Sequence, residues 1–153
     1  MNMIPDWAPN AHPLIIHFPL ALLCAAVAVD LTAWTLRRHQ ALRQTATVLY
    51  VLGTLGAVVA YVTGRAAAAS VWLPGMAHEV VGEHWTWAWR AVWFFAALAV
   101  ARLVLLRPSR GVPSHVLLAV LTVAGFVGLG LLIETGDRGG RLVYLHGVGT
   151  NRD

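Results

Sequence analysis

The chain has 153 residues, of which 58% are hydrophobic and only 12% are charged, and its formal net charge is +4 at pH 7. A soluble domain usually carries about 25% charged residues, and a chain this short has too little interior to cover so many apolar side chains. The composition therefore argues against a soluble domain and indicates an integral membrane protein. Basic residues stand at the ends of apolar runs, which is typical of membrane orientation, so no nucleic-acid partner is expected.

Four apolar stretches are long enough to cross a hydrocarbon layer, which takes about 20 helical residues. Because backbone polar groups in lipid must be satisfied within the segment, each stretch is expected to be a helix. These stretches are 14–36, 45–69, 85–106 and 114–133. The sequence thus predicts one all-α domain over residues 1–153, an integral membrane four-helix bundle with a loop at 70–84 and a glycine-rich tail at 134–153.

The distribution of arginine predicts how this bundle is oriented. The connections 37–43 and 102–110 hold six arginines and no acidic residue, whereas the opposite side mixes acidic and basic residues. The positive-inside rule then places both connections in the cytoplasm. We therefore expect a multi-pass protein of the bacterial cytoplasmic (inner) membrane, in contact with the lipid bilayer, with both termini on the outer, periplasmic side. The first apolar run follows no basic segment and is expected to remain as an anchor.

Five of the seven histidines fall on the outer side of this topology. His12 and His17 open the first span, His78 and His84 precede the third, and His146 follows the fourth. Imidazole is a common ligand of haem iron, zinc and copper. A lone histidine at the membrane interface is more often a hydrogen-bonding surface residue, but the convergence of several segments favours a cofactor site near the outer face.

Haem b is the cofactor that this pattern favours. A bis-histidine haem takes one imidazole from each of two facing helices. We expect His17 and His84 as the axial ligands, with His146, His12 and His78 as the next candidates. Small residues in two spans would admit a flat macrocycle, or would simply allow the helices to pack closely. They are Gly53, Gly56, Ala60 and Gly64 in the second span and Gly125, Gly128 and Gly130 in the fourth.

Charged residues inside the spans are costly in lipid, so each is expected to have a partner. Asp30 lies in the first span and Arg102 at a comparable depth in the third, which predicts a structural ion pair. Arg90 lies about two turns inside the third span, where it could snorkel, pair with Glu134 or hold a haem propionate. Arg141, in the glycine-rich tail, is the other candidate for a propionate.

The glycine-rich tail contains the apolar stretch LVYL (142–145), which is too short to cross a membrane. We expect a short strand or a re-entrant segment that folds over the outer mouth of the bundle. His146 would then cap the same site as His17 and His84. A flexible tail is the alternative.

Several of these segments resemble one known family. They are HPLIIHFPLAL (12–22), the aspartate of the first span, Thr63–Gly64, a histidine before the third span, and GGRLVYLHGVG (139–149). Over nearly the whole chain the sequence is similar to the bacterial four-helix membrane proteins grouped as domain of unknown function 2231. The resemblance implies that the motif histidines are His12, His17 and His146, with either His78 or His84 as the third-span member. These proteins are often likened to small b-type cytochromes, which implies haem near the outer face.

Three functions fit these features. The first is a cytochrome-like redox protein that binds haem b and exchanges electrons with other membrane subunits or a periplasmic electron carrier. The second is a non-catalytic accessory subunit of a larger respiratory or photosynthetic complex. The third is a zinc or copper site built from His17, His84 and neighbouring histidines with Glu79 or Glu83. Independent catalysis is not expected, because the sequence has no GxSxG, HExxH or P-loop motif.

Overall fold

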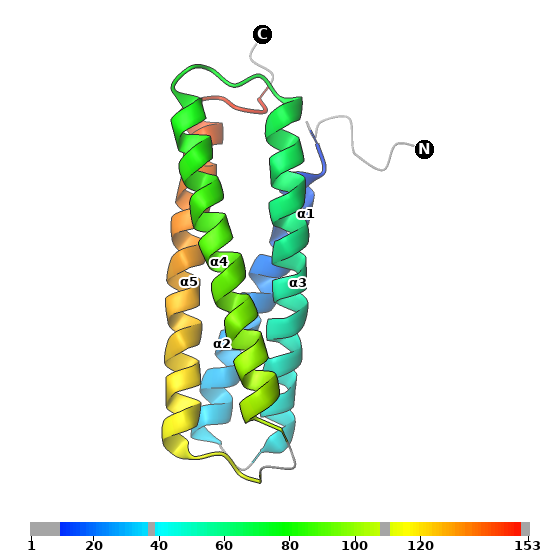
Figure 1. Ribbon diagram of the computed structural model, residues 1–153, viewed down its shortest axis with the longest axis vertical. Helices are drawn as coiled ribbons and strands as arrows, with labels where there is room; N and C mark the ends of the chain where they lie inside the picture. The colour runs from blue at the N-terminus through cyan, green and yellow to red at the C-terminus, as the bar shows by residue number, and fades with distance from the viewer. Residues whose placement is uncertain (1–9, 37–38, 108–110, 151–153) are drawn as a thin grey trace, which may run out of the picture.

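The computed structural model describes residues 10–36, 39–107 and 111–150. All regular structure in these ranges is helical. The helices are α1 (His12–Ile15), α2 (His17–Thr35), α3 (Gln40–Ser70), α4 (Ala77–Leu105) and α5 (His115–Tyr144). Because α1 and α2 form one span together, the fold is an up-and-down bundle of four long helices (Figure 1). Each is long and apolar enough to cross a membrane, which confirms the predicted all-α bundle of four membrane-spanning helices.

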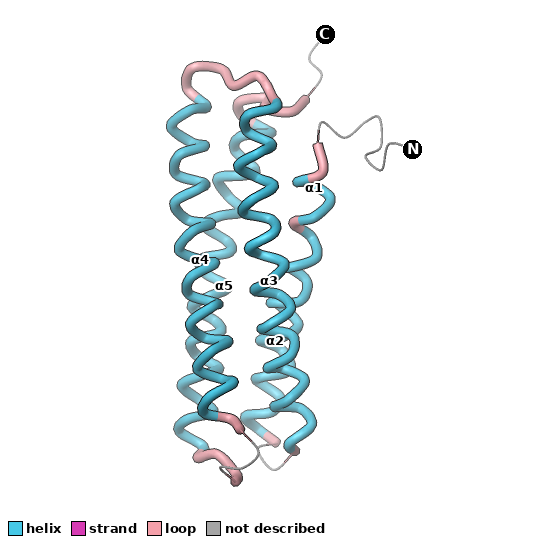
Figure 2. Tube along the Cα trace, turned by 45° about the vertical axis from the view of Figure 1, so that its right-hand side comes forward, coloured by secondary structure: helices cyan, strands magenta, loops and turns pink. Residues whose placement is uncertain are grey.

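The two ends of the bundle carry different residues. One end holds the start of α1, the α3–α4 connection and the turn after α5 (Figures 1 and 2). We call it the histidine end, because five histidines lie towards it, and we call the opposite end the arginine end. Three arginines of the connections predicted to be cytoplasmic, Arg37, Arg38 and Arg110, lie outside the described residues. The orientation of the bundle in the membrane stays a prediction.

Each long helix packs against two neighbours, in the order α2, α3, α4, α5 and back to α2. Glycine lets α2 and α3 approach closely, because a Cβ atom on Gly53 would lie 2.7 Å from Leu23 and one on Gly56 3.2 Å from Pro19. Leu23, Tyr50 and Phe95 fill the centre and are fully buried. Large apolar side chains are exposed on every long helix, as expected for a bundle whose surrounding solvent is hydrocarbon.

The first span is interrupted at Ile16, between α1 and α2. Pro19 causes this interruption, because proline has no N–H to donate to the carbonyl of Ile15. The backbone of Ile16 is still near-helical, with φ −60° and ψ −28°, so the span continues in the same direction. His12 and His17 nevertheless face different surroundings: His12 is half-buried and His17 is exposed.

The histidine end is more helical than the sequence predicted. The expected loop at 70–84 is wrong in its second half, because α4 begins at Ala77. The expected strand or re-entrant segment in the glycine-rich tail is also wrong, because α5 continues through three glycines to Tyr144. Glycine costs a helix about 1 kcal/mol relative to alanine. Two ion pairs between residues four apart, Glu134–Arg138 at 2.6 Å and Asp137–Arg141 at 2.8 Å, and packing against α4 offset this cost.

The turn after α5 depends on glycine. Gly147 has a φ of 66° and Gly149 a φ of 75°, in the left-handed region where other residues are strained. The N–H of Val148 donates to the carbonyl of Leu142 at 2.9 Å, and that of Gly147 donates to the carbonyl of Val143 at 3.0 Å. These bonds satisfy carbonyls at the helix end and turn the chain back across the histidine end (Figure 1).

A buried ion pair joins α2 to α4 towards the arginine end. Arg102 donates from Nη1 to Asp30 Oδ2 at 2.7 Å, and the two side chains are 0% and 1% exposed. The guanidinium also lies 4.8 Å over the ring of Tyr50. Asp30 therefore has the partner that its position in the sequence suggested.

Candidate histidine site

His12 is held against α3 through one ring nitrogen. Its Nδ1 lies 3.3 Å from Thr63 Oγ1. The hydroxyl of Thr63 donates its own proton to backbone carbonyls, at 2.9 Å from Val59 O and 3.1 Å from Ala60 O. The oxygen of Thr63 is thus left to accept from His12 Nδ1–H, and a neutral imidazole protonated at Nδ1 keeps a free lone pair on Nε2.

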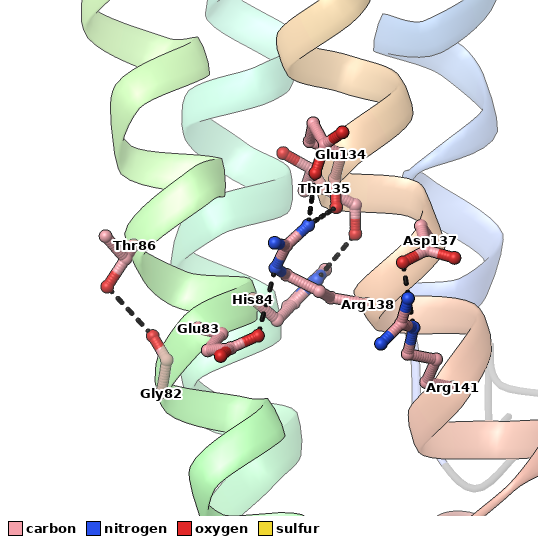
Figure 3. Close-up of polar contacts among 9 residues, drawn as sticks. All are labelled: Gly82, Glu83, His84, Thr86, Glu134, Thr135, Asp137, Arg138 and Arg141. Carbon is pink, nitrogen blue, oxygen red and sulfur yellow. Dashed lines mark hydrogen bonds and ion pairs between the residues drawn. The ribbon is translucent and has the colours of Figure 1, made fainter.

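His84 is held against α5 in the same way. Its Nδ1 donates to the carbonyl oxygen of Thr135 at 2.9 Å (Figure 3). A carbonyl can only accept, so this bond fixes the proton on Nδ1 and leaves the lone pair on Nε2. The ring comes this close to α5 because of Gly139, where an added Cβ atom would lie 3.3 Å from His84 Cε1.

The two imidazoles belong to helices on opposite sides of the bundle, at its histidine end. Each ring packs on a glycine of a neighbouring helix: an added Cβ on Gly64 would lie 2.8 Å from His12 Cε1, and Gly139 plays the same part for His84. Histidines that ligate metals usually have the other ring nitrogen engaged by a hydrogen bond, which fixes the tautomer and the ring orientation. His12 and His84 both have this arrangement.

Charged residues surround His84 at the histidine end. Arg138 of α5 contacts Glu83 of α4 at 3.2 Å and Glu134 at 2.6 Å (Figure 3). It also lies 4.8 Å over the ring of Trp87. Since Glu83 precedes His84 and Arg138 precedes Gly139, this bridge holds α4 and α5 together directly beside the imidazole. Glu134, one of the partners predicted for Arg90, pairs instead with Arg138.

Arg65 is an exposed residue of α3 that stacks on α4 near the histidine end. It follows Gly64, on which His12 packs, and its guanidinium is 4.4 Å over the ring of Trp85, the residue after His84. Within the described parts of the chain no carboxylate forms an ion pair with Arg65. Its place over Trp85 could not be predicted from the sequence, because it depends on how α3 and α4 pack.

The other predicted ligands lie elsewhere. His17 is exposed, on the side of α2 away from the buried Pro19 and Leu23. His78 is exposed in the first turn of α4, and His146 is half-buried in the turn after α5. His12 and His84 thus hydrogen-bond to neighbouring helices, whereas His17, the predicted partner of His84, is exposed.

The two arginines considered for a propionate are both exposed. Arg90 lies 5.0 Å over the ring of Trp87, and Arg141 pairs with Asp137 at 2.8 Å. Among the described residues, no three histidine, cysteine, aspartate or glutamate side chains come together closely enough to hold a metal ion. The zinc or copper site considered from the sequence is therefore not formed in these ranges.

Comparison with known proteins gives a family but no characterised relative. No curated protein and no solved structure matches the chain. Residues 8–152 match the family described as predicted membrane protein (DUF2231), and this match covers almost every residue of the sequence. The chain therefore belongs to the DUF2231 family of predicted membrane proteins.

Proposed function

We propose that the protein is a cytochrome-like electron carrier that binds haem b between His12 and His84. One observation carries this proposal: at the same end of the bundle, two imidazoles from separate helices are each held through Nδ1, which leaves the lone pair of the neutral ring on Nε2. Bis-histidine ligation of a haem needs two such nitrogens from facing helices.

The surroundings of the two rings also fit this ligand. Gly64 and Gly139 give each ring a flat backbone surface that any side chain would fill. Neutral imidazoles inside a membrane bundle lose their hydration, and one hydrogen bond per ring recovers only part of it. A metal bound to the two Nε2 atoms would supply the missing interactions. The bonds to Thr63 and Thr135 would orient the rings and raise their basicity as ligands.

Haem bound here would supply one-electron exchange, and the chain's own residues would set the conditions for it. The site lies towards the histidine end rather than at the centre of the bundle (Figure 1). Electrons would therefore be exchanged with a partner on that side of the membrane, either another membrane subunit or a soluble carrier. In the predicted orientation this is the periplasmic side of the inner membrane.

Replacement of single histidines tests the proposal. Protein purified in mild detergent from cells with ample haem is expected to contain haem, and His12→Ala or His84→Ala should remove most of it. His17→Ala is the matched control, since His17 opens the same span but is exposed. Loss of haem from the His17 variant alone would contradict the ligand assignment. Protein without haem would favour the accessory-subunit function instead.

A further inference from the structure

We propose that the seam between α3 and α4 at the histidine end binds one anionic phospholipid, with the phosphate on Arg65 and the acyl chains along Trp89 and Trp93. This site is separate from the histidines and does not depend on haem. Its parts are an exposed cation stacked on a ring, its depth in the membrane, and a column of aromatic rings that continues along the seam.

Arg65 is the cation that the phosphate would contact. Its side chain is exposed, and in the described residues no carboxylate forms an ion pair with it, whereas Arg138 and Arg141 are both paired. The guanidinium lies 4.4 Å over the ring of Trp85. This stacking uses the face of the planar group and leaves the N–H donors at its edge free. Those donors form the fork that binds a phosphate through parallel hydrogen bonds.

The position of Arg65 along α3 matches the depth of a phospholipid headgroup. α3 has 31 residues, which make about 46 Å of helix, and a bilayer with its headgroups is about 40–45 Å thick. Arg65 stands five residues before the last residue, Ser70, or about 8 Å inside that end. The polar layer on each side of the hydrocarbon is roughly 5–7 Å thick. The guanidinium therefore lies where the headgroups meet the hydrocarbon.

A column of aromatic rings continues the seam from Arg65 towards the arginine end. Tyr61 of α3 packs on Trp89 of α4 with ring centroids 5.5 Å apart, and Trp89 packs on Trp93 at 5.4 Å. Trp89 and Trp93 are 48% and 58% exposed, so one side of this column is open to lipid. An acyl chain that continues from a headgroup on Arg65 would lie along these rings.

Polar atoms in the column stand at the depth of the lipid esters. Tyr61 and Trp89 are each one helical turn, about 6 Å, deeper than Arg65 and Trp85. Within the described ranges the hydroxyl of Tyr61 and the indole N–H of Trp89 have no hydrogen-bond partner. Such donors are costly in hydrocarbon, and the ester carbonyls between headgroup and acyl chains can accept from them. Because the charge of Arg65 is not neutralised, a headgroup with net negative charge is favoured over a zwitterionic one.

Lipid selectivity of the delipidated protein tests this site. Native mass spectrometry in mild detergent would give the dissociation constants of dioleoylphosphatidylglycerol and dioleoylphosphatidylcholine for wild type and variants. Wild type should prefer phosphatidylglycerol, and Arg65→Gln should bind it about tenfold more weakly and lose the preference, the effect of one charge-assisted contact. Arg141→Gln is the matched control, because Arg141 is exposed at the same end but paired with Asp137, and it should keep the preference.

Three results would overturn the proposal. One is equal binding of the two lipids by wild type. Another is the same loss of preference in Arg90→Gln, because Arg90 stacks on Trp87, a ring that also contacts Arg138 of α5, and so lies off the seam. The third is displacement of phosphatidylglycerol by millimolar inorganic phosphate, which would indicate an anion site without a lipid. Haem takes part in none of these measurements, so their outcome is independent of the proposed function.

Discussion

Asp30 of α2 and Arg102 of α4 form an ion pair of 2.7 Å inside the bundle, where neither side chain is more than 1% exposed. The order of packing around the bundle makes α2 and α4 diagonal partners, so this contact crosses the interior. At the other end of the same two spans, His12 and His84 each hydrogen-bond to a different neighbour, α3 and α5 respectively.

Removal of Arg102 should destabilise the protein strongly. Arg102→Leu leaves the Asp30 carboxylate buried without its partner, which costs about 3–5 kcal/mol. The double variant Asp30→Leu/Arg102→Leu should regain most of this loss, because no unpaired charge remains. Thermal unfolding in detergent, followed by circular dichroism, measures both. Arg107→Leu is the control at the same end, since Arg107 is exposed, and a melting temperature for Arg102→Leu equal to that of Arg107→Leu would refute the importance of the pair.

Gly64 should tolerate no side chain. In Gly64→Ala the new Cβ would lie 2.8 Å from His12 Cε1, so the imidazole must move and the haem should be lost or bound more weakly. Gly136→Ala is the matched control on α5, because nothing lies within 4 Å of its added Cβ. This second variant should keep its haem and gain up to about 1 kcal/mol in stability from better helix propensity. Haem content per protein, measured after purification, distinguishes the two, and equal retention would contradict the assigned packing.

The hydroxyl of Thr63 should matter for haem affinity. Thr63→Val removes the acceptor for His12 Nδ1–H while it keeps the shape of the side chain. Loss of such a partner typically lowers metal affinity about 10- to 100-fold. Thr86→Val is the control, because the Thr86 hydroxyl contacts only its own helix, at Gly82 O. Titration of the haem-free protein with haem would show the difference, and unchanged affinity in Thr63→Val would mean that His12 is not a ligand.

The predicted orientation can be tested with single cysteines. In a Cys24→Ser background, Gly75→Cys marks the α3–α4 connection and Val112→Cys marks the exposed approach to α5 at the arginine end. A maleimide that cannot cross membranes should label Gly75→Cys once it has access to the periplasmic face, and Val112→Cys only after the membrane is broken. The reverse pattern would place the histidine site on the cytoplasmic side.

Much of this fold could be predicted from the sequence, because lipid imposes simple demands. Four apolar stretches had to be helices, and Asp30 needed a partner at its own depth, which Arg102 supplies. The prediction for the glycine-rich tail was wrong because it relied only on the low intrinsic helix propensity of glycine. Ion pairs along α5 and packing on His84 decide the outcome there.

The histidine pairing could not be read from the sequence. His12 and His17 are only five residues apart, and the sequence does not say which of them faces the bundle. That choice depends on the helix phase around Ile16 and on the contact of the first span with α3. The stacking of Arg65 on Trp85 could not be predicted for a similar reason, since it depends on how α3 and α4 pack.

The most direct test of the histidine site as a haem site is the absorption spectrum of the purified protein, air-oxidised and then reduced with dithionite. A Soret band that shifts on reduction, with sharp α and β bands, is expected for wild type and His17→Ala, and it should be absent from His84→Ala. A featureless visible spectrum of wild-type protein made with ample haem would contradict the account. His12 and His84 would then be hydrogen-bonded residues that hold the helices of a structural subunit.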